Sequence, residues 1–219
     1  MTSKTFKTFL QEYPTKMLGP EKLQSFLPYE WISSVDMTNL RQGKHTSITL
    51  DEDSPEYKKI ATPITKILRK GSTECIKVRQ IDQLENPFIY VMYLLKKHEN
   101  YREYICKEIN CYHGTKDENV PLILGNNLNW RFFGNRVGHV HGKGVYFSKF
   151  AEISMHYAMP HGAKGSMLLV KVLVASAAPG TNSTSLPPEF YDTTGTRDDQ
   201  ILVKYSDNEF YPEFVAYLE

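Results

Sequence analysis

The chain has 219 residues, is 41% hydrophobic and 12% aromatic, and has 26 Lys and Arg against 25 Asp and Glu, which gives a net charge of +1. This composition suits one well-packed domain with a short extension and excludes wholesale disorder. A near-neutral protein lacks the broad positive field that drives non-specific nucleic-acid binding, so a nucleic-acid partner is not indicated. Three cysteines without a C-x-x-C pair argue against both a disulfide framework and a zinc site.

Membrane, secretory and metal signals are also missing from the sequence. No apolar run approaches the roughly 20 residues of a membrane span, and Met1–Phe6 lacks the apolar core of a secretory signal. Four histidines lie close in sequence without HExxH spacing or cysteine partners: His139, His141, His156 and His161. We therefore expect a monomeric cytoplasmic or nuclear protein that binds neither a membrane nor a metal.

The N-terminal quarter of the chain has weaker structural signals than the rest. Residues 1–53 are predicted to be an extension that is partly helical or irregular, with a helix in the first 25 residues and one short strand over 47–50. The main domain is expected to span residues 54–219.

Two helices and a strand are predicted at the start of this domain. Ser54-Pro55 begins the first helix with a hydroxyl cap and a proline at the first helical position, and Pro63 should kink or divide it. Residues 76–79 alternate like a half-buried strand. Asn86-Pro87 begins the second helix, whose buried stripe should be formed by Phe88, Val91, Met92 and Leu95.

The middle of the chain holds a strand, a helix and a long glycine-containing loop. Residues 109–112 are predicted to form a strand that ends at His113-Gly114. Thr115–Glu118 has the capping-box pattern of a helix start, and Gly125–Asn127 should end that helix. Residues 127–144 hold four glycines and little periodicity, which is typical of a functional loop.

The last third is dominated by strands. We expect strands over 145–147, 167–174, 201–205 and 214–218, a helix over 151–158 capped by Ser148, and a loop over 179–199. Helices come early and strands late without βαβ alternation, so the fold class is α+β with a mixed or antiparallel sheet. Gly142-x-Gly144 lacks the remaining glycine of the Rossmann fingerprint and precedes a strand, which disfavours a Rossmann site.

One combination of motifs indicates which kind of reaction the chain carries out. His113-Gly114-Thr115 alone is weak, because a strand-end histidine or a strand tyrosine is most often structural. Here the motif is followed by the glycine-bearing loop, by Gly-Lys-Gly-Val-Tyr-Phe-Ser over 142–148, and by Ser154-x-x-Tyr157. This order and spacing resemble the catalytic domain of the poly(ADP-ribose) polymerase superfamily, most closely its mono-ADP-ribosylating branch with zinc-finger and WWE members. The resemblance implies an ADP-ribosyltransferase fold, with mixed or antiparallel sheets around an NAD cleft and flanking helices.

Further segments resemble the same branch. Residues 85–88 resemble its QNPF helix start, with Glu85 in place of Gln, and residues 127–131 resemble its NFDWR segment. Tyr191-Asp192 resembles its YDS, and residues 211–215 resemble its YPEYV closing strand. The resemblance covers roughly residues 54–219.

The resemblance implies NAD+ as substrate, with no metal, and a role for each matching residue. The backbone N–H and C=O of Gly114 would bind the nicotinamide carboxamide, and Ser154 would add a hydroxyl donor. Tyr157 would stack on the nicotinamide ring, with Tyr146 as the opposite wall. His113 would bind the adenosine ribose. The remaining expected binding residues are Thr115, Phe147 and, on the donor loop over 127–143, Arg131, which would meet the pyrophosphate.

The third position of the family's His-Tyr-Glu triad indicates the product. Polymerising members place Glu at the start of a late strand, where this chain has Ile201. An isoleucine cannot act as a base toward an incoming sugar hydroxyl. The pattern His113-Tyr146-Ile201 therefore predicts a protein mono-ADP-ribosyltransferase. The alternative is a catalytically silent domain that binds NAD or ADP-ribose or scaffolds partners; a polymerase and an RNA-binding role are disfavoured.

Overall fold

The computed structural model describes residues 25–31, 44–68, 71, 73–103, 106–132, 140–160 and 164–219. In this part of the chain, the strands form one nine-stranded sheet in the order β1-β2-β9-β5-β3-β4-β8-β7-β6. They are β1 (Thr46–Thr49), β2 (Val78–Glu85), β3 (Lys107–Thr115), β4 (Val145–Ser148), β5 (Gly165–Val174), β6 (Ala177–Pro179), β7 (Thr193–Gly195), β8 (Ile201–Lys204) and β9 (Phe210–Leu218). The β6–β7 pair is parallel and the other pairs are antiparallel, so the sheet is mixed and the α+β prediction is confirmed.

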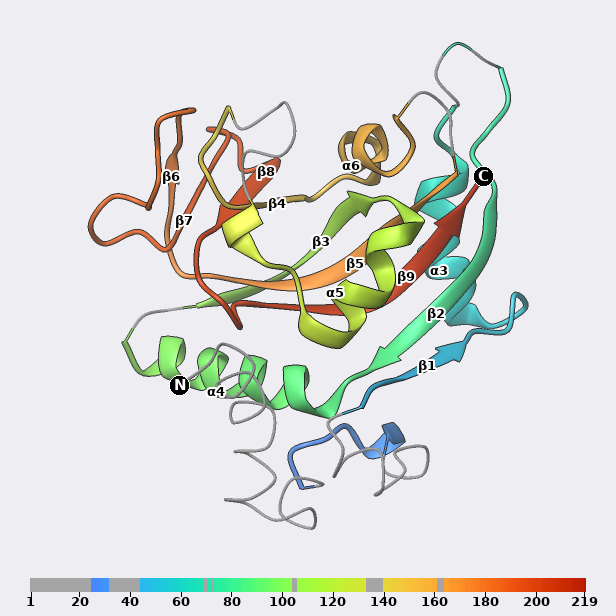
Figure 1. Cartoon of the computed structure of the whole chain (residues 1–219), viewed down its shortest axis with the longest axis horizontal. Helices are drawn as coiled ribbons and strands as arrows, with labels where there is room; N and C mark the ends of the chain where they lie inside the picture. The colour runs from blue at the N-terminus through green and yellow to red at the C-terminus, as the bar shows by residue number, and fades with distance from the viewer. Residues whose placement is uncertain are drawn as a thin grey trace.

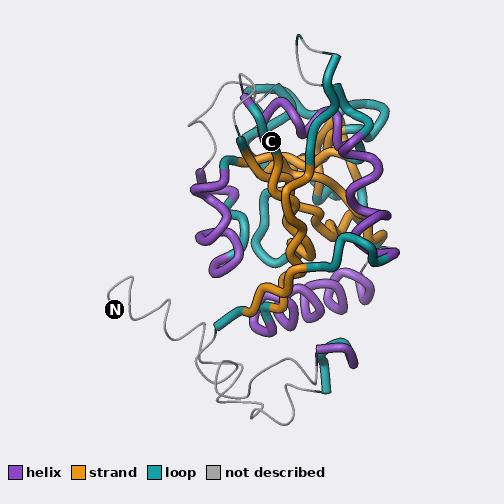
Figure 2. Tube along the Cα trace, turned by 90° about the vertical axis from the view of Figure 1, so that its right-hand side faces the viewer, coloured by secondary structure: helices purple, strands orange, loops and turns teal. Residues whose placement is uncertain are grey.

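Helices cover both faces of the sheet (Figures 1 and 2). They are α3 (Pro55–Thr65), α4 (Pro87–Glu103), α5 (Val120–Asn126) and α6 (Ala151–Ala158), with 3-10 turns η1 (Tyr29–Trp31), η2 (Asp117–Asn119) and η3 (Trp130–Phe132). Alternate residues of β5 divide between two cores: Leu168 packs with α4 and α5, whereas Met167 packs with α3 and α6. This alternation follows from the two-residue period of a strand.

The described part of residues 1–53 belongs to the same sheet and core as the rest. β1 is an edge strand that pairs antiparallel with β2. Trp31 of η1 is buried, with its ring centroid 5.0 Å from that of Tyr90 and 6.1 Å from that of Tyr211. The helix expected near the N-terminus falls on residues 1–24, outside the described residues.

Two helix starts that were predicted from local capping signals are confirmed. Ser54 Oγ accepts a hydrogen bond from the Tyr57 N–H at 3.1 Å, and Pro55 is the first residue of α3. The helix continues through Pro63 and ends at Thr65, so the proline lies in its last turn. α4 begins at Pro87 as predicted, and Asn86 Oδ1 accepts from the Ile89 N–H at 3.1 Å.

The buried stripe predicted for α4 is partly wrong. Val91 is buried, but Leu95 is exposed, and the buried residues of the helix include Ile89 and Tyr93. Every residue from Phe88 to Leu95 is apolar, so spacing alone does not select the face that packs on the sheet.

Two predicted helix caps are also wrong. Thr115 is the last residue of β3, paired with Ser166 of β5, and α5 begins only at Val120 after η2. Ser148 ends β4 and its Oγ accepts from the Phe150 N–H at 3.0 Å, but Phe150 is the N-cap of α6. In both cases pairing with a distant strand outweighs a local capping preference.

β7 lies within the loop predicted over 179–199, and β6 ends at Pro179, the first residue of that loop.

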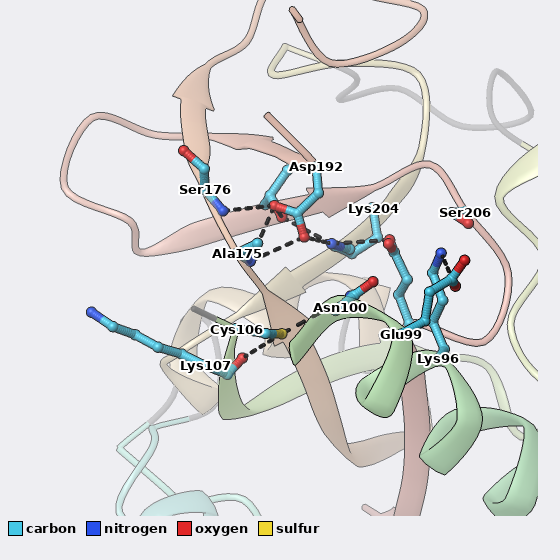
Figure 3. A network of polar contacts seen from close by, with 12 residues as sticks. Lys96, Glu99, Asn100, Cys106, Lys107, Ala175, Ser176, Asp192, Lys204 and Ser206 are labelled. Atoms are coloured by element: carbon cyan, nitrogen blue, oxygen red, sulfur yellow. Dashed lines mark hydrogen bonds and ion pairs between the residues drawn. The ribbon is translucent and has the colours of Figure 1, made fainter. Parts of the chain in front are cut away.

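Beside these strands lies a charged cluster around Lys204, which is fully buried on β8 (Figure 3). Lys204 Nζ lies 2.7 Å from Asp192 Oδ2, 3.0 Å from Glu209 Oε2 and 3.0 Å from Thr193 Oγ1. A buried ammonium is tolerated only when it is paired in this way. The cluster therefore links β8 to the segments that precede β7 and β9.

The two carboxyls of the cluster respond differently to burial. Burial raises the pKa of Glu209, and the nearby Lys204 ammonium reduces this effect without cancelling it. Burial also acts to raise the pKa of Asp192, but Lys204 and the Ser176 and Ala175 N–H groups together hold that pKa below its ordinary value. Asp192 is thus the carboxylate stabilised in its charged form.

We expect Lys204→Met to reduce the free energy of unfolding by about 3–5 kcal/mol, because it leaves buried carboxylates without their cation. Urea unfolding at neutral pH measures the change. The matched control is Lys58→Met, whose side chain is 61% exposed and pairs with Asp53 at 3.4 Å. It should change stability by no more than about 0.5 kcal/mol. Equal effects of the two substitutions would contradict a stabilising role for the buried cluster.

Candidate active site

The candidate site lies at the point where backbone pairing between β3 and β4 ends. β3 pairs with β5 from Lys107 to Thr115, but its register with β4 contains one pair, Tyr112↔Ser148. Next to this pair, His113 Nδ1 lies 2.8 Å from the backbone oxygen of Tyr146. A carbonyl oxygen only accepts, so Nδ1 carries the proton in this bond, and the neutral ring then has Nε2 as its acceptor. The structure thus brings His113 and Tyr146 together.

The phenol of Tyr146 is held by the backbone of the preceding segment. Its oxygen accepts from the His141 N–H at 3.0 Å and donates to Gly142 O at 2.8 Å. Burial is the main cause that raises the pKa of Tyr146 to about 12, and the nearby Tyr205 and Tyr157 phenols contribute to this rise. The phenol therefore stays protonated at neutral pH, and Tyr157 lies close enough to act on it electrostatically.

Two residues predicted to bind the cofactor have buried side chains that pack beside the site. Phe147 is 1% exposed, with its ring centroid 5.9 Å from that of His113 and 5.3 Å from that of Phe210. Thr115 is buried, and its Oγ1 accepts from Asn119 Nδ2 at 3.1 Å. Both side chains belong to the interior of the fold, and a role of Thr115 and Phe147 in binding NAD stays a prediction.

Gly114 lies directly under α6. A Cβ atom at this position would lie 2.0 Å from Ser154 O and 2.6 Å from Ala158 N, both backbone atoms. Ser154 is buried on the same helix, and its Oγ donates to Tyr112 O at 3.0 Å. Because this bond uses the hydroxyl proton, Ser154 in this rotamer can accept from a ligand amide but does not donate to one. Tyr157, on the same helix, is 38% exposed.

Ile201 begins β8 and is paired with Ser148, two residues along β4 from Tyr146. Tyr146 pairs with Val203, so Tyr146, Val203 and Ile201 share one face of the sheet. The acidic residues that follow on the chain are engaged elsewhere: Glu209 pairs with Lys204, and Glu213 with Lys171. The position where the family's polymerising members have a carboxylate is apolar in this chain.

Arg131 already has an anionic partner. Its guanidinium nitrogens lie 3.0 and 2.9 Å from the two carboxylate oxygens of Asp207, and the group lies over the Trp130 ring at 4.8 Å. A pyrophosphate would have to compete with Asp207 for this residue. The predicted donor loop is described from Asn127 to Phe132 and from Val140 onward; residues 133–139 lie outside the described part.

Sequence reasoning missed the partners that hold these side chains. His141 and Gly142 bind the Tyr146 hydroxyl through their backbone atoms. The residue type does not reveal such backbone contacts. Asp207 meets Arg131 from 76 residues away. The described residues contain no group of three or more His, Cys, Asp or Glu side chains that could hold a metal, and no described helix is long and apolar enough to cross a bilayer.

Comparison with known families agrees with this geometry. Residues 54–203 match the family described as poly(ADP-ribose) polymerase catalytic domain, so the chain belongs to that family. This places it in the class of NAD+ ADP-ribosyltransferases, whose catalytic domains use NAD+ as substrate.

The chain is similar to proteins named as mono-ADP-ribosyltransferases. It is 28% identical over 220 residues to human "Protein mono-ADP-ribosyltransferase PARP12", covering 95% of this chain and 29% of the relative. The mouse protein of the same name is 28% identical over 217 residues, 94% of this chain and 29% of the relative. Mouse "Protein mono-ADP-ribosyltransferase PARP10" is 26% identical over 145 residues, 64% and 15% of the two lengths. The chain spans less than a third of the length of these relatives.

We expect Gly114→Ala to reduce the free energy of unfolding by about 1–3 kcal/mol, because the added methyl group must push α6 away from β3. Thermal and urea unfolding measure the change. The control is Gly125→Ala in α5, where the nearest atom to a new Cβ is His45 Cε1 at 3.8 Å. That substitution should be neutral or stabilising by up to about 1 kcal/mol, since alanine is the better helix former. If Gly114→Ala were equally harmless, the close contact between α6 and β3 would be wrong.

Proposed function

We propose that the chain transfers one ADP-ribose from NAD+ to a side chain of an acceptor protein and releases nicotinamide. The observation that carries the proposal is the hydrogen bond from His113 Nδ1 to Tyr146 O at 2.8 Å, which brings together the two family residues expected to hold NAD. Ile201 lies on the same sheet face as Tyr146, where a polymerising member has Glu. The names of the relatives agree with this product.

In the proposed complex, each end of NAD is bound by a group that the fold already holds. Nε2 of neutral His113 accepts from a hydroxyl of the adenosine ribose. The nicotinamide ring lies between Tyr146 and the exposed ring of Tyr157, an offset aromatic contact. Its carboxamide meets the Gly114 backbone and donates an N–H to Ser154 Oγ, whose own proton is bound by Tyr112 O.

The reaction needs orientation more than acid–base chemistry. The bond between ribose C1′ and the nicotinamide nitrogen breaks, and nicotinamide leaves neutral with the electron pair. The remaining ribose has oxocarbenium character, as in glycoside hydrolysis. A nucleophile of the acceptor then forms the new bond to C1′. A fixed pose brings the reacting atoms together and lowers the entropic part of the barrier.

The nature of the acceptor follows from the missing carboxylate. A sugar hydroxyl is a poor nucleophile at neutral pH and needs a positioned base, which Ile201 cannot supply. Glu209 and Glu213 are held by lysines and do not replace it. A carboxylate or thiolate of a protein carries its own negative charge and attacks without such a base. Transfer therefore stops after one ADP-ribose.

Labelled NAD+ incubated with the purified chain and an acceptor should give discrete bands on a denaturing gel, each with one ADP-ribose per modified site by mass spectrometry. His113→Ala, which removes the proposed ribose contact, should abolish these bands without a large fall in melting temperature. A ladder or high-mass smear that a poly(ADP-ribose) hydrolase removes would overturn the single-transfer proposal.

Tyr157→Ala should weaken nicotinamide binding by about 1 kcal/mol or more, because the stacking face is lost. Titration calorimetry with nicotinamide measures the change. Tyr29→Ala is the control, because Tyr29 is 84% exposed on η1 and belongs to a different part of the fold. Unchanged affinity in a folded Tyr157→Ala protein would remove this residue from the proposed site.

A further inference from the structure

Two buried hydroxyls lie behind the segment that holds Tyr146. Thr194 of β7 donates from Oγ1 to His141 O at 2.6 Å, and the same Oγ1 is hydrogen-bonded to the Tyr205 hydroxyl. The Tyr205 hydroxyl oxygen also lies 3.5 Å from His141 O, but Thr194 Oγ1 is much closer, at 2.6 Å. Thr194 therefore donates its proton to the carbonyl, and the Tyr205 hydroxyl donates to Thr194. Thr194 and Tyr205 are both buried, and burial raises the pKa of Tyr205, which keeps its proton in place.

Further hydrogen bonds join the same backbone segment to the candidate site. The Tyr205 hydroxyl donates to Thr194, and Thr194 donates to His141 O. The His141 N–H in turn donates to the Tyr146 hydroxyl at 3.0 Å, which donates to Gly142 O at 2.8 Å. The bonds meet at neighbouring peptide groups of one backbone segment, so they act on Tyr146 by fixing the position of that segment.

Packing leaves the same segment little room to move. Gly142 has φ +132°, and a Cβ there would lie 1.7 Å from the Tyr205 hydroxyl oxygen. A Cβ on Gly180 would lie 1.9 Å from His141 O. The Lys143 N–H donates to Thr184 O at 2.9 Å. Both sides of the 141–143 backbone are therefore in contact with the β6–β7 connection or with Tyr205.

The register of the sheet explains why these residues meet. Tyr146 on β4 and Thr194 on β7 are both paired with Val203 of β8, so they share a face, and Tyr205 follows Val203 by two residues. The adjacent Thr193 points to the opposite face, where its Oγ1 accepts from Lys204 Nζ at 3.0 Å. The buried ion cluster thus anchors the strand that carries Thr194.

We propose that Thr194 and Tyr205 are positioning residues that fix the phenol of Tyr146 through the backbone of His141 and Gly142. This rests on the proposed function, in which Tyr146 forms one wall of the nicotinamide site. The two hydroxyls touch neither NAD nor the acceptor. Their effect is to hold Tyr146 in one orientation before the substrate binds.

The test uses the whole chain and three variants at these positions. Thr194→Val and Tyr205→Phe each remove a hydroxyl while keeping the shape of the side chain, and Thr194→Ser keeps the hydroxyl. Losing one hydrogen bond of the network should lower kcat/KM for NAD+ by about tenfold and raise the Kd of nicotinamide by a similar factor. Thr194→Ser should restore both values.

Tyr211→Phe separates positioning from mere stability. Tyr211 is fully buried and its hydroxyl donates to Leu84 O at 2.7 Å, beside α4 and far along the sheet from β8. It should lower the melting temperature as Tyr205→Phe does and leave kcat/KM and the nicotinamide Kd unchanged. The proposal is overturned if Thr194→Val and Tyr205→Phe keep wild-type values, or if Tyr211→Phe lowers them equally.

Two readouts distinguish failure of the proposed function from failure of the positioning proposal. If the wild-type chain releases no nicotinamide from NAD+, catalysis is excluded, but the nicotinamide Kd still reports the geometry of the Tyr146 wall. A raised Kd in Thr194→Val, restored in Thr194→Ser, would then still support positioning. An unchanged Kd across the series would overturn it.

Discussion

The hydrogen bond from His113 to the Tyr146 carbonyl joins two parts of one sheet where backbone pairing stops. β3 and β4 share a single registered pair, Tyr112↔Ser148, and the histidine ring takes the place of the next rung. The part-buried Tyr146 carbonyl accepts its hydrogen bond from this ring. The opening of the ladder places the next residue, Gly114, against α6 and Tyr146 against the 141–143 segment.

The polar groups around the site fall into two physical kinds. Tyr146 is half-buried and bonded on both sides by backbone groups, so its orientation is set before a ligand arrives, which is the arrangement that favours catalysis. Arg131 and Asp207 form a bidentate pair that is largely exposed, where solvent screening leaves little net stabilisation. An anion can therefore exchange with Asp207 at small cost. At the nicotinamide end of the proposed site, Tyr146 is thus held by backbone bonds, whereas the Arg131–Asp207 pair is exposed to solvent.

The sequence predicted best what depends on neighbours in the chain. Ser54-Pro55 begins a helix as expected, because a capping hydroxyl and a proline at the first position act within one turn. Thr115 looked like a similar start, but pairing with Ser166 of β5 places it in a strand. The fold class and family followed from motif order, whereas the groups that hold the site did not. Thr194 meets His141 from 53 residues away, and Lys204 is explained only by carboxylates that the folded sheet brings to it.

Nicotinamide release from NAD+ by the purified chain, quantified by chromatography, tests the central claim most directly. A protein that holds both His113 and Tyr146 as observed should release nicotinamide in step with ADP-ribose attached to an acceptor. It should lose that release when His113 is replaced by alanine and the fold is intact. A folded wild-type chain that binds NAD+ but releases no nicotinamide with any protein acceptor would contradict the account and would define a silent binding domain.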